Sequence, residues 1–239
     1  MATQSKRLSE LYVAVLVGGL GTRLRSVIAD RPKVLAEIHG VPFLAILLDQ
    51  LAAAGCCSVV LCTGYQGDRI SGAFGSQYGP LRLRYSQEHR PLGTAGALRL
   101  ALPELDSDPV LVMNGDSYCA IDLTAYWEWH RERWANASMA LSKVTRSDRF
   151  GVVKLDSDAR IMEFAEKKES GEGWINAGIY FLSQQVLRSI PANGCVSLER
   201  EIFPQWIGHG FYGYPSVAPF IDIGTPGDFA AAENFFHRG

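Results

Sequence analysis

The residues with the most evident chemistry lie in a glycine-rich stretch that directly follows an apolar run. Residues 15–35 read VLVGGLGTRLRSVIADRPKVL, and the candidate binding groups within them are Gly18, Gly19, Gly21, Arg23 and Lys33. A glycine turn exposes backbone N–H groups to an anion, while arginine offers a planar charged fork and lysine a point charge. The bland alternative is a tight turn with solvated basic side chains. As a binding site, the stretch predicts a ligand with several phosphate charges, such as a triphosphate.

Two common nucleotide-binding motifs do not fit this stretch. A dinucleotide fingerprint needs GxGxxG, but Leu24 stands where a third glycine would allow close helix packing. A P-loop needs GxxxxGK followed by Ser or Thr, and no such string occurs in the sequence. What remains is a Gly-Gly-x-Gly turn supplemented by Arg23 and Lys33.

Acidic residues mark three other places in the chain. Glu88 lies five residues before a Gly93-Thr94-Ala-Gly turn, where Thr94 is a candidate helix cap. Asp116 belongs to the Asn-Gly-Asp that ends the buried strand in VLVMNGDS, either in a simple turn or as an oxygen ligand for Mg²⁺ at the carboxyl end of the strand. Asp222 lies among apolar residues in PFIDIGTPGDF, where a carboxylate without a partner is costly to bury, so we expect a cation nearby.

Strand and helix patterns alternate in the first half of the chain. Runs rich in β-branched residues predict buried strands, and Gly or Pro marks several helix boundaries between them. We expect strands at 11–17, 58–64, 81–86 and 109–116, with helices at 42–54, 66–74 and 94–102. This order is typical of a doubly wound sheet, in which ligands bind outside the carboxyl ends of the strands.

The second half is less regular and leaves little room for helices between its strands. We expect strands at 137–144, 151–156, 160–167, 175–183 and 211–215, with helices at 122–134, 184–190, 197–207 and 226–237. These strands suggest antiparallel additions to a mixed sheet. With no repeat, low-complexity tract or linker, residues 1–239 read as a single domain, made of a nucleotide-binding half (about 11–116) and a second half (about 117–239).

Composition excludes several classes of protein. The 239 residues are 47% hydrophobic and 20% charged, with a net charge of −2, so nucleic acid is not an expected partner. No apolar stretch approaches the roughly 20 residues that span a bilayer. Lys6 and Arg7 precede an apolar run, as in a secretory signal, but no small-x-small cleavage site ends it. The five cysteines form no CxxC pair, which favours reduced thiols and a cytoplasmic protein.

The stretch GGLGTRLRSVIADRPKVL resembles the GGxGTRL…PK signature of the sugar-phosphate nucleotidylyltransferases. The resemblance implies a Rossmann-like doubly wound mixed sheet in three α/β/α layers. It also implies a Mg²⁺-dependent enzyme that joins a nucleoside triphosphate to a sugar 1-phosphate and releases pyrophosphate. In such an enzyme, the triphosphate would be wrapped by Val17, Gly18, Gly19, Gly21 and Thr22, and Arg23 and Lys33 would neutralise its phosphates.

The resemblance also assigns the base and metal sides of the site. The segment with Gly93 and Thr94 would clamp the base, and Asp116 and Asp222 would jointly hold Mg²⁺. Glu88 then favours GTP, because a carboxylate can accept hydrogen bonds from the N1–H and the exocyclic amine of guanine. Uracil and thymine present an edge that suits an amide better, so UTP and dTTP are alternatives.

The sugar side of the family pattern is matched by FAEKKESGEGWINAGIYFL, residues 164–182, and by RFGVV, residues 149–153. By this resemblance, Lys167 would act catalytically by positioning the sugar phosphate. The sugar would be bound by Asn114, Gly151, Glu166, Asn176 and Gly178. Lys168 replaces the family's common proline, which leaves open whether Lys167 or Lys168 faces the site.

One departure from the signature bears on the substrate. Ser26-Val27-Ile28 stands where the family often has Pro-Leu-Thr, and this variant resembles a smaller branch that acts on heptose and related sugar 1-phosphates. GTP with D-glycero-D-manno-heptose 1-phosphate, giving GDP-heptose, is therefore the preferred pair. The alternatives are mannose 1-phosphate with GTP, or another hexose 1-phosphate with UTP or dTTP.

A different class of function is a nucleotide-sugar-binding regulatory subunit without turnover. Such relatives would be expected to lose a metal aspartate or a phosphate-side cation, whereas this chain has Arg23, Lys33, Asp116 and Asp222. An aromatic cluster at helical spacing is typical of a core or a subunit interface, and a homodimer is compatible with it. Its members are Tyr126, Trp127, Trp129 and Trp134.

Overall fold

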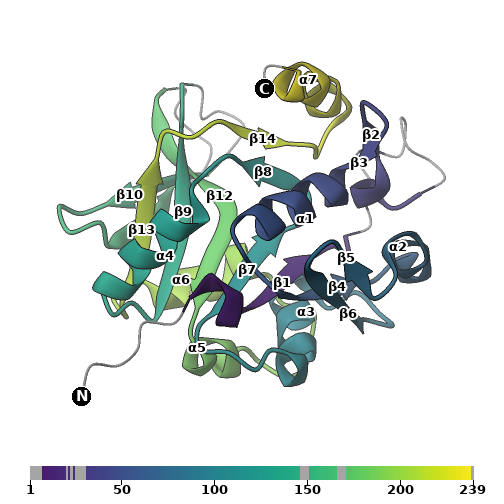
Figure 1. Ribbon diagram of the computed structural model, residues 1–239. Helices are drawn as coiled ribbons and strands as arrows, with labels where there is room; N and C mark the ends of the chain where they lie inside the picture. The colour runs from purple at the N-terminus through teal and green to yellow at the C-terminus, as the bar shows by residue number, and fades with distance from the viewer. Residues whose placement is uncertain are drawn as a thin grey trace.

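Four parallel strands form the centre of a ten-stranded mixed sheet in the computed structural model (Figure 1), which describes residues 7–19, 21, 24, 31–145, 151–165 and 171–237. The central strands lie in the spatial order β6, β4, β1, β7, and their bounds are Leu81–Gln87, Ser58–Thr63, Tyr12–Leu16 and Val110–Asn114. The chain order therefore reverses beside β1, between β1 and β7. In open α/β sheets, this switch point is where a crevice opens at the carboxyl ends of the strands.

The second half adds antiparallel strands next to β7. The long strand β12 (Gly173–Leu182) pairs antiparallel with β7, and it also pairs with β9 (Ala137–Val144) and β10 (Val152–Leu155). The remaining strands of the sheet are edge or outer strands: β5 (Gln77–Tyr78), β11 (Ile161–Ala165) and β13 (Phe211–Ser216). The expected mixed sheet is confirmed, with the parallel part contributed by the first half of the chain.

Helices cover both faces of the sheet because its central strands are apolar on both sides. Val13 and Val15 of β1 pack into one core, whereas Ala14 between them packs into the other. One face carries α1 (Phe43–Ala53), α2 (Gly67–Phe74), α4 (Leu123–Glu132) and α7 (Pro226–Phe236). The other carries α3 (Gly93–Ala101), α5 (Gln184–Ser189), η5 (Leu198–Ile202) and α6 (Phe203–Trp206). The three-layer α/β/α arrangement expected from the sequence is thus present.

Short elements complete the connections. Single 3₁₀ turns occur at η1 (Leu8–Glu10), η3 (Lys33–Leu35) and η4 (Leu102–Glu104). A small hairpin joins β2 (Glu37–Ile38) to β3 (Val41–Pro42), and a two-stranded ladder joins β8 (Ser117–Cys119) to β14 (Phe220–Asp222). No helix in the described part of the chain is long and apolar enough to cross a membrane. All five cysteines are free thiols.

The predicted helix 197–207 differs from the structure in its first half. Residues Leu198–Ile202 form a π-helical turn in which the Phe203 N–H bonds to the Leu198 carbonyl, and a regular α-helix follows only from Phe203 to Trp206. Pro204 has no N–H to donate to the carbonyl four residues earlier, so the preceding turn is free to widen.

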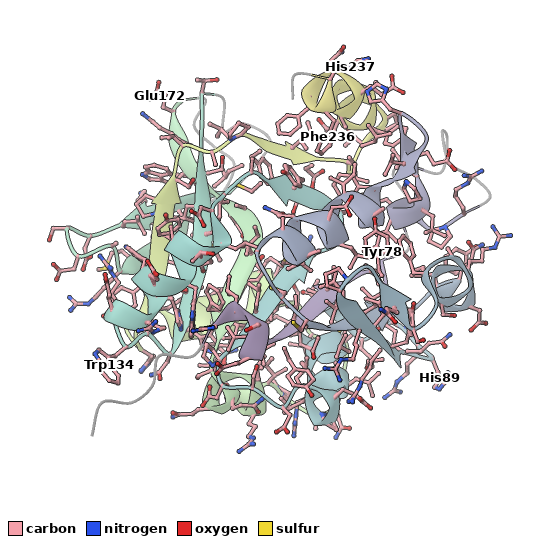
Figure 2. All side chains as sticks on the ribbon, in the orientation of Figure 1. Tyr78, His89, Trp134, Glu172, Phe236 and His237 are labelled. Atoms are coloured by element: carbon pink, nitrogen blue, oxygen red, sulfur yellow. The ribbon has the colours of Figure 1, made fainter. Side chains whose placement is uncertain are left out.

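The aromatic cluster in and just after α4 divides between core and solvent. Tyr126 and Trp127 are buried against Phe181, whereas Trp134 is 91% exposed and projects from the lower left of the molecule in Figure 2. The predicted core role therefore holds for the first two residues. Trp134 is not part of this core.

A buried histidine on α4 makes stability depend on pH. His130 Nδ1 lies 2.7 Å from Ser138 Oγ, and burial lowers the pKa of His130 from 6.5 to about 4. The unfolded chain takes up this proton near pH 6.5, whereas the folded protein resists it until about pH 4. The contribution to stability is therefore present above pH 6.5 and lost as the pH falls, by up to about 3 kcal/mol for His130.

We expect this loss to disappear when the titratable ring is removed. The free energy of unfolding of wild type and His130→Gln would be measured by denaturant titration between pH 7 and pH 4. The stability advantage of wild type over His130→Gln should shrink as the pH falls, because only wild type contains a buried ring that must stay unprotonated in the folded state. A difference that stays constant over the range would contradict the assignment.

Candidate active site

A cavity of about 670 Å³ opens at the switch point of the sheet. It lies at the carboxyl ends of β1, β4 and β7, where the fold rule places a ligand. Six of the residues predicted to bind a nucleotide line it: Val17, Gly18, Gly19, Glu88, Gly93 and Thr94. The lining also includes Lys33, Asn114 and Asp116. The structure thus brings together residues from sequence segments up to about 100 positions apart.

The glycine turn packs closely against the end of β4. Val17 N–H donates to the carbonyl of Cys62 at 2.9 Å, which continues the strand pairing into the turn. A Cβ atom on Gly64 would lie 2.8 Å from both the Gly18 carbonyl oxygen and Glu88 Oε1, so no side chain fits there. The turn therefore presents backbone to the cavity at a place where two strand ends and a carboxylate converge.

Glu88 lies at the end of β6 with one oxygen fixed. Its Oε2 accepts a hydrogen bond from Leu92 N–H at 3.0 Å, and its Oε1 lies beside Gly18 and Gly64. Burial raises the pKa of Glu88, and the Leu92 N–H partly lowers it. A half-buried carboxylate with a held orientation and remaining acceptor capacity can receive hydrogen bonds from a ligand in the cavity.

The expectation that Thr94 caps its own helix is wrong. Helix α3 begins at Gly93, its cap residue is Leu92, and no side chain caps it. The Thr94 hydroxyl instead donates to Glu199 Oε2 at 2.9 Å and accepts from Leu198 N–H at 2.8 Å. Local sequence cannot reveal this, because both partners lie about 100 residues away.

Two aspartates and one lysine form a charged corner at the cavity: Lys33 and Asp116 line it, whereas Asp222 lies beside Asp116 and is not part of the lining. Lys33 Nζ lies 2.9 Å from Asp116 Oδ2, and the lysine side chain is only 11% exposed. The β8–β14 ladder sets Asp222 opposite Ser117, and Ile223 N–H donates to the Asp116 carbonyl at 2.9 Å. Burial and the neighbouring Asp116 charge raise the pKa of Asp222, whereas the Lys33 charge and the Gly224 N–H lower it. The two carboxylates are therefore near neighbours.

These carboxylates fit a hard divalent cation. Mg²⁺ takes oxygen ligands, usually one or two carboxylates from the protein, and completes its shell with waters and phosphate oxygens. Within the described ranges, no group of three or more His, Cys, Asp and Glu side chains is placed to hold a metal. The donor set of Asp116 and Asp222 therefore suits an ion that is shared with a phosphate ligand.

The predicted sugar residues are divided between the cavity wall and the layer behind it. Asn176 accepts a hydrogen bond from Gly178 N–H at 2.8 Å and donates to Tyr180 Oη at 2.8 Å. Gly178 has φ +76° in an irregularity of the β12–β9 pairing, and a Cβ there would lie 2.5 Å from Ser117 Oγ. Asn114 lines the cavity directly, and its Nδ2 donates to the same Tyr180 oxygen at 3.4 Å.

Other predicted residues lie elsewhere or outside the described ranges. Gly21 has φ +58°, and Gly151 is an exposed residue ahead of β10; neither lines the cavity. Five further residues, and the 26–28 segment, lie outside the described residues: Thr22, Arg23, Glu166, Lys167 and Lys168.

Several cavity residues were missed by the sequence reasoning. Tyr65 follows Gly64 at the end of β4, and the strand-end rule could have found it. Cys195 and Glu199 had no comparable signal, because they reach the cavity through the tertiary packing of η5 and the residues just before it against α3.

Comparisons with known proteins agree with this architecture. The Nucleotidyl transferase family model matches residues 12–239. D-glycero-alpha-D-manno-heptose 1-phosphate guanylyltransferase from Aneurinibacillus thermoaerophilus is 36% identical over 92% of this chain and 95% of its own length. Mannose-1-phosphate guanylyltransferase from Mycobacterium tuberculosis is 38% identical over 96% of this chain and 66% of its own length.

A solved structure is also similar along almost the whole chain. The crystal structure of HddC from Yersinia pseudotuberculosis superimposes with a TM-score of 0.85 at 32% identity and covers 95% of this chain and 99% of HddC. A second structure of HddC, complexed with GMP-PN, has a TM-score of 0.84. The fold, the cavity and these matches together define a nucleotidyl transferase, and the chain belongs to that family. The expected family membership is confirmed.

The close approach at Gly64 gives a stability test. Gly64→Ala should lower the free energy of unfolding by about 1–3 kcal/mol, because the added methyl group pushes Glu88 and Gly18 apart. Gly72→Ala, on an exposed and open part of α2, is the matched control and should instead stabilise by up to about 1 kcal/mol. Thermal unfolding of both variants checks the pair. Equal melting temperatures of Gly64→Ala and Gly72→Ala would contradict the packing described for the turn.

Proposed function

We propose that this chain, a sugar-1-phosphate nucleotidylyltransferase, uses GTP and D-glycero-D-manno-heptose 1-phosphate and forms GDP-heptose and pyrophosphate. The observation that carries the choice of GTP is Glu88, whose carboxylate is held at the glycine turn by Leu92 N–H. Guanine offers two donors on the edge that such a carboxylate would meet, whereas uracil and thymine offer one. HddC from Yersinia pseudotuberculosis, which has been solved with the guanine nucleotide GMP-PN, supports the same choice.

In the proposed reaction, a phosphate oxygen of the sugar 1-phosphate attacks the α-phosphorus of GTP, and the bond to pyrophosphate breaks. The attacking oxygen is already negatively charged, so no general base is needed. The protein contributes alignment and charge neutralisation, which are the main sources of catalysis in phosphoryl transfer. The backbone of Gly18 and Gly19 would bind the triphosphate, with Arg23 and Lys33 neutralising its charge. Lys167 would position the incoming phosphate.

Asp116 and Asp222 would hold Mg²⁺ in this reaction. The ion would supply positive charge where negative charge develops between the α-phosphorus and its leaving group. Lys33 already balances Asp116 at 2.9 Å, so the same corner that would hold the ion also holds a resident cation. In this proposal, Lys33 and the ion held by the two carboxylates would together neutralise the negative charge of the triphosphate.

Mannose 1-phosphate is the second candidate for the sugar substrate. The relatives named heptose 1-phosphate and mannose-1-phosphate guanylyltransferases are 36% and 38% identical to this chain, which does not separate the two sugars. We favour the heptose because Ser26-Val27-Ile28 departs from the common signature, and this variant resembles the branch that acts on heptose 1-phosphates.

The test is a matrix of substrates. GTP, ATP, UTP and dTTP would each be paired with heptose, mannose, glucose and N-acetylhexosamine 1-phosphates, and pyrophosphate release would be measured with Mg²⁺. The highest kcat/KM is expected for GTP with heptose 1-phosphate. A preference for UTP or dTTP would contradict the base assignment. A preference for mannose 1-phosphate would make mannose, in place of heptose, the assigned sugar. Tight GTP binding without turnover on any pair would favour a regulatory subunit instead.

A single substitution tests whether Glu88 recognises the base. Glu88→Gln should lower the ratio of kcat/KM for GTP to that for UTP by about tenfold or more, because an amide cannot accept both guanine donors. Glu104→Gln, which alters a surface carboxylate paired with Arg84, is the control and should leave the ratio unchanged. An unaltered GTP/UTP ratio in Glu88→Gln would remove Glu88 from base recognition.

A further inference from the structure

Helix α3, which opens at the base side of the cavity, is capped by a distant segment of the chain. Ala95 N–H donates to the Val196 carbonyl at 3.0 Å, and Val196 N–H donates back to the Leu92 carbonyl at 2.8 Å. A Cβ on Gly93 would collide with the Val196 carbonyl, so the turn and the segment are in close backbone contact. The start of α3 is therefore fixed by the chain around Val196, and no side chain of its own first turn caps it.

Glu199 is the charged member of this contact. Its Oε2 accepts from the Thr94 hydroxyl at 2.9 Å and from the Ser197 hydroxyl at 2.9 Å. The Thr94 hydroxyl also accepts from Leu198 N–H at 2.8 Å, so both its donor and one acceptor position are used. Thr94 is thereby fixed in position and in hydroxyl orientation by η5.

The location of Glu199 argues that this contact serves the site. Glu199 lines the same cavity as Glu88 and Asp116, and it lies on the π-helical turn Leu198–Ile202. A carboxylate on the wall of a cavity that receives a triphosphate repels the ligand, so it needs a compensating role. π-helical turns are frequent at functional sites. The two hydroxyl hydrogen bonds of Glu199 supply such a role.

We propose that Glu199 is a positioning residue for the base: it acts through the Thr94 hydroxyl to hold the Gly93–Thr94 turn against the bound nucleotide. The inference rests on the proposed function, since it takes the base of GTP to lie at this turn. Thr94 and Gly93 both line the cavity, and their backbone N–H groups are the first two of α3. The next two N–H groups, those of Ala95 and Gly96, bond to the Val196 carbonyl at 3.0 and 3.4 Å.

The variants separate positioning from simple structural support. Glu199→Ala should raise both the Kd and the KM for GTP about tenfold, the value of one lost charge-assisted hydrogen bond, while kcat at saturating GTP changes less than about twofold. Glu199→Gln should restore most of the affinity, because its amide oxygen still accepts from both hydroxyls. Glu201→Ala is the matched control: Glu201 Oε1 accepts from Ser197 N–H at 2.9 Å on the same turn, but the residue is exposed.

A double-variant cycle tests whether Glu199 acts through Thr94. Thr94→Val removes the hydroxyl. The double variant Thr94→Val/Glu199→Ala should have the same Kd for GTP as whichever single variant binds GTP more weakly. The proposal would be overturned if the two substitutions raised the Kd for GTP independently, so that their fold-changes multiplied in the double variant. An unchanged Kd in Glu199→Ala, or an equal rise of the Kd in Glu201→Ala, would also overturn it. A rise confined to the KM for the sugar phosphate would also overturn it, because Glu199 would then read the sugar.

Calorimetric titration of GTP keeps this test separate from the proposed reaction. Wild type that binds GTP but turns over no sugar 1-phosphate would defeat the proposed function, yet the Kd values of the variants would still decide the role of Glu199. Conversely, normal turnover with an unchanged Kd in Glu199→Ala would defeat only the present inference.

Discussion

The site depends on one electrostatic constraint, the convergence of two carboxylates and a lysine at the switch point of the sheet. The β8–β14 ladder brings Asp222 beside Asp116, although the two are more than 100 residues apart in the chain. Neighbouring half-buried carboxylates repel each other, and the raised pKa of Asp222 reflects burial and the Asp116 charge. Lys33 offsets this repulsion at 2.9 Å from Asp116.

The other parts of the cavity take their positions from the same sheet. The glycine turn follows β1, Glu88 follows β6 and Asp116 follows β7, so three sides of the cavity are positioned by the carboxyl ends of strands in the same parallel part of the sheet. The antiparallel strand β12 then places Asn176, Gly178 and Tyr180 beside Asn114. The parallel half of the fold therefore positions the residues proposed to bind the nucleotide, and the antiparallel addition positions Asn176 and Gly178, which are expected to meet the sugar.

Sequence reasoning placed cavity residues most successfully where they directly follow the end of a strand. A buried apolar run followed by glycines or an aspartate could be placed correctly without knowledge of the packing, as for Gly18 and Asp116. It failed where a contact joins distant segments. Thr94 resembled a helix cap but bonds to Leu198 and Glu199, and the three-residue strands β8 and β14 are too short to leave a periodic pattern. Such contacts depend on tertiary packing, which hydrophobic periodicity does not encode.

The central claim, that Asp116 and Asp222 form one cation site shared with the triphosphate, is tested most directly by Mn²⁺ binding. Electron paramagnetic resonance would count the Mn²⁺ bound in the presence of GTP by wild type, Asp222→Asn and the surface control Asp158→Asn, since Mn²⁺ accepts the same oxygen ligands as Mg²⁺. The account predicts one bound ion in wild type and in the control, and an affinity at least about tenfold weaker in Asp222→Asn, which removes one carboxylate charge. Equal Mn²⁺ affinity in wild type and Asp222→Asn would contradict it.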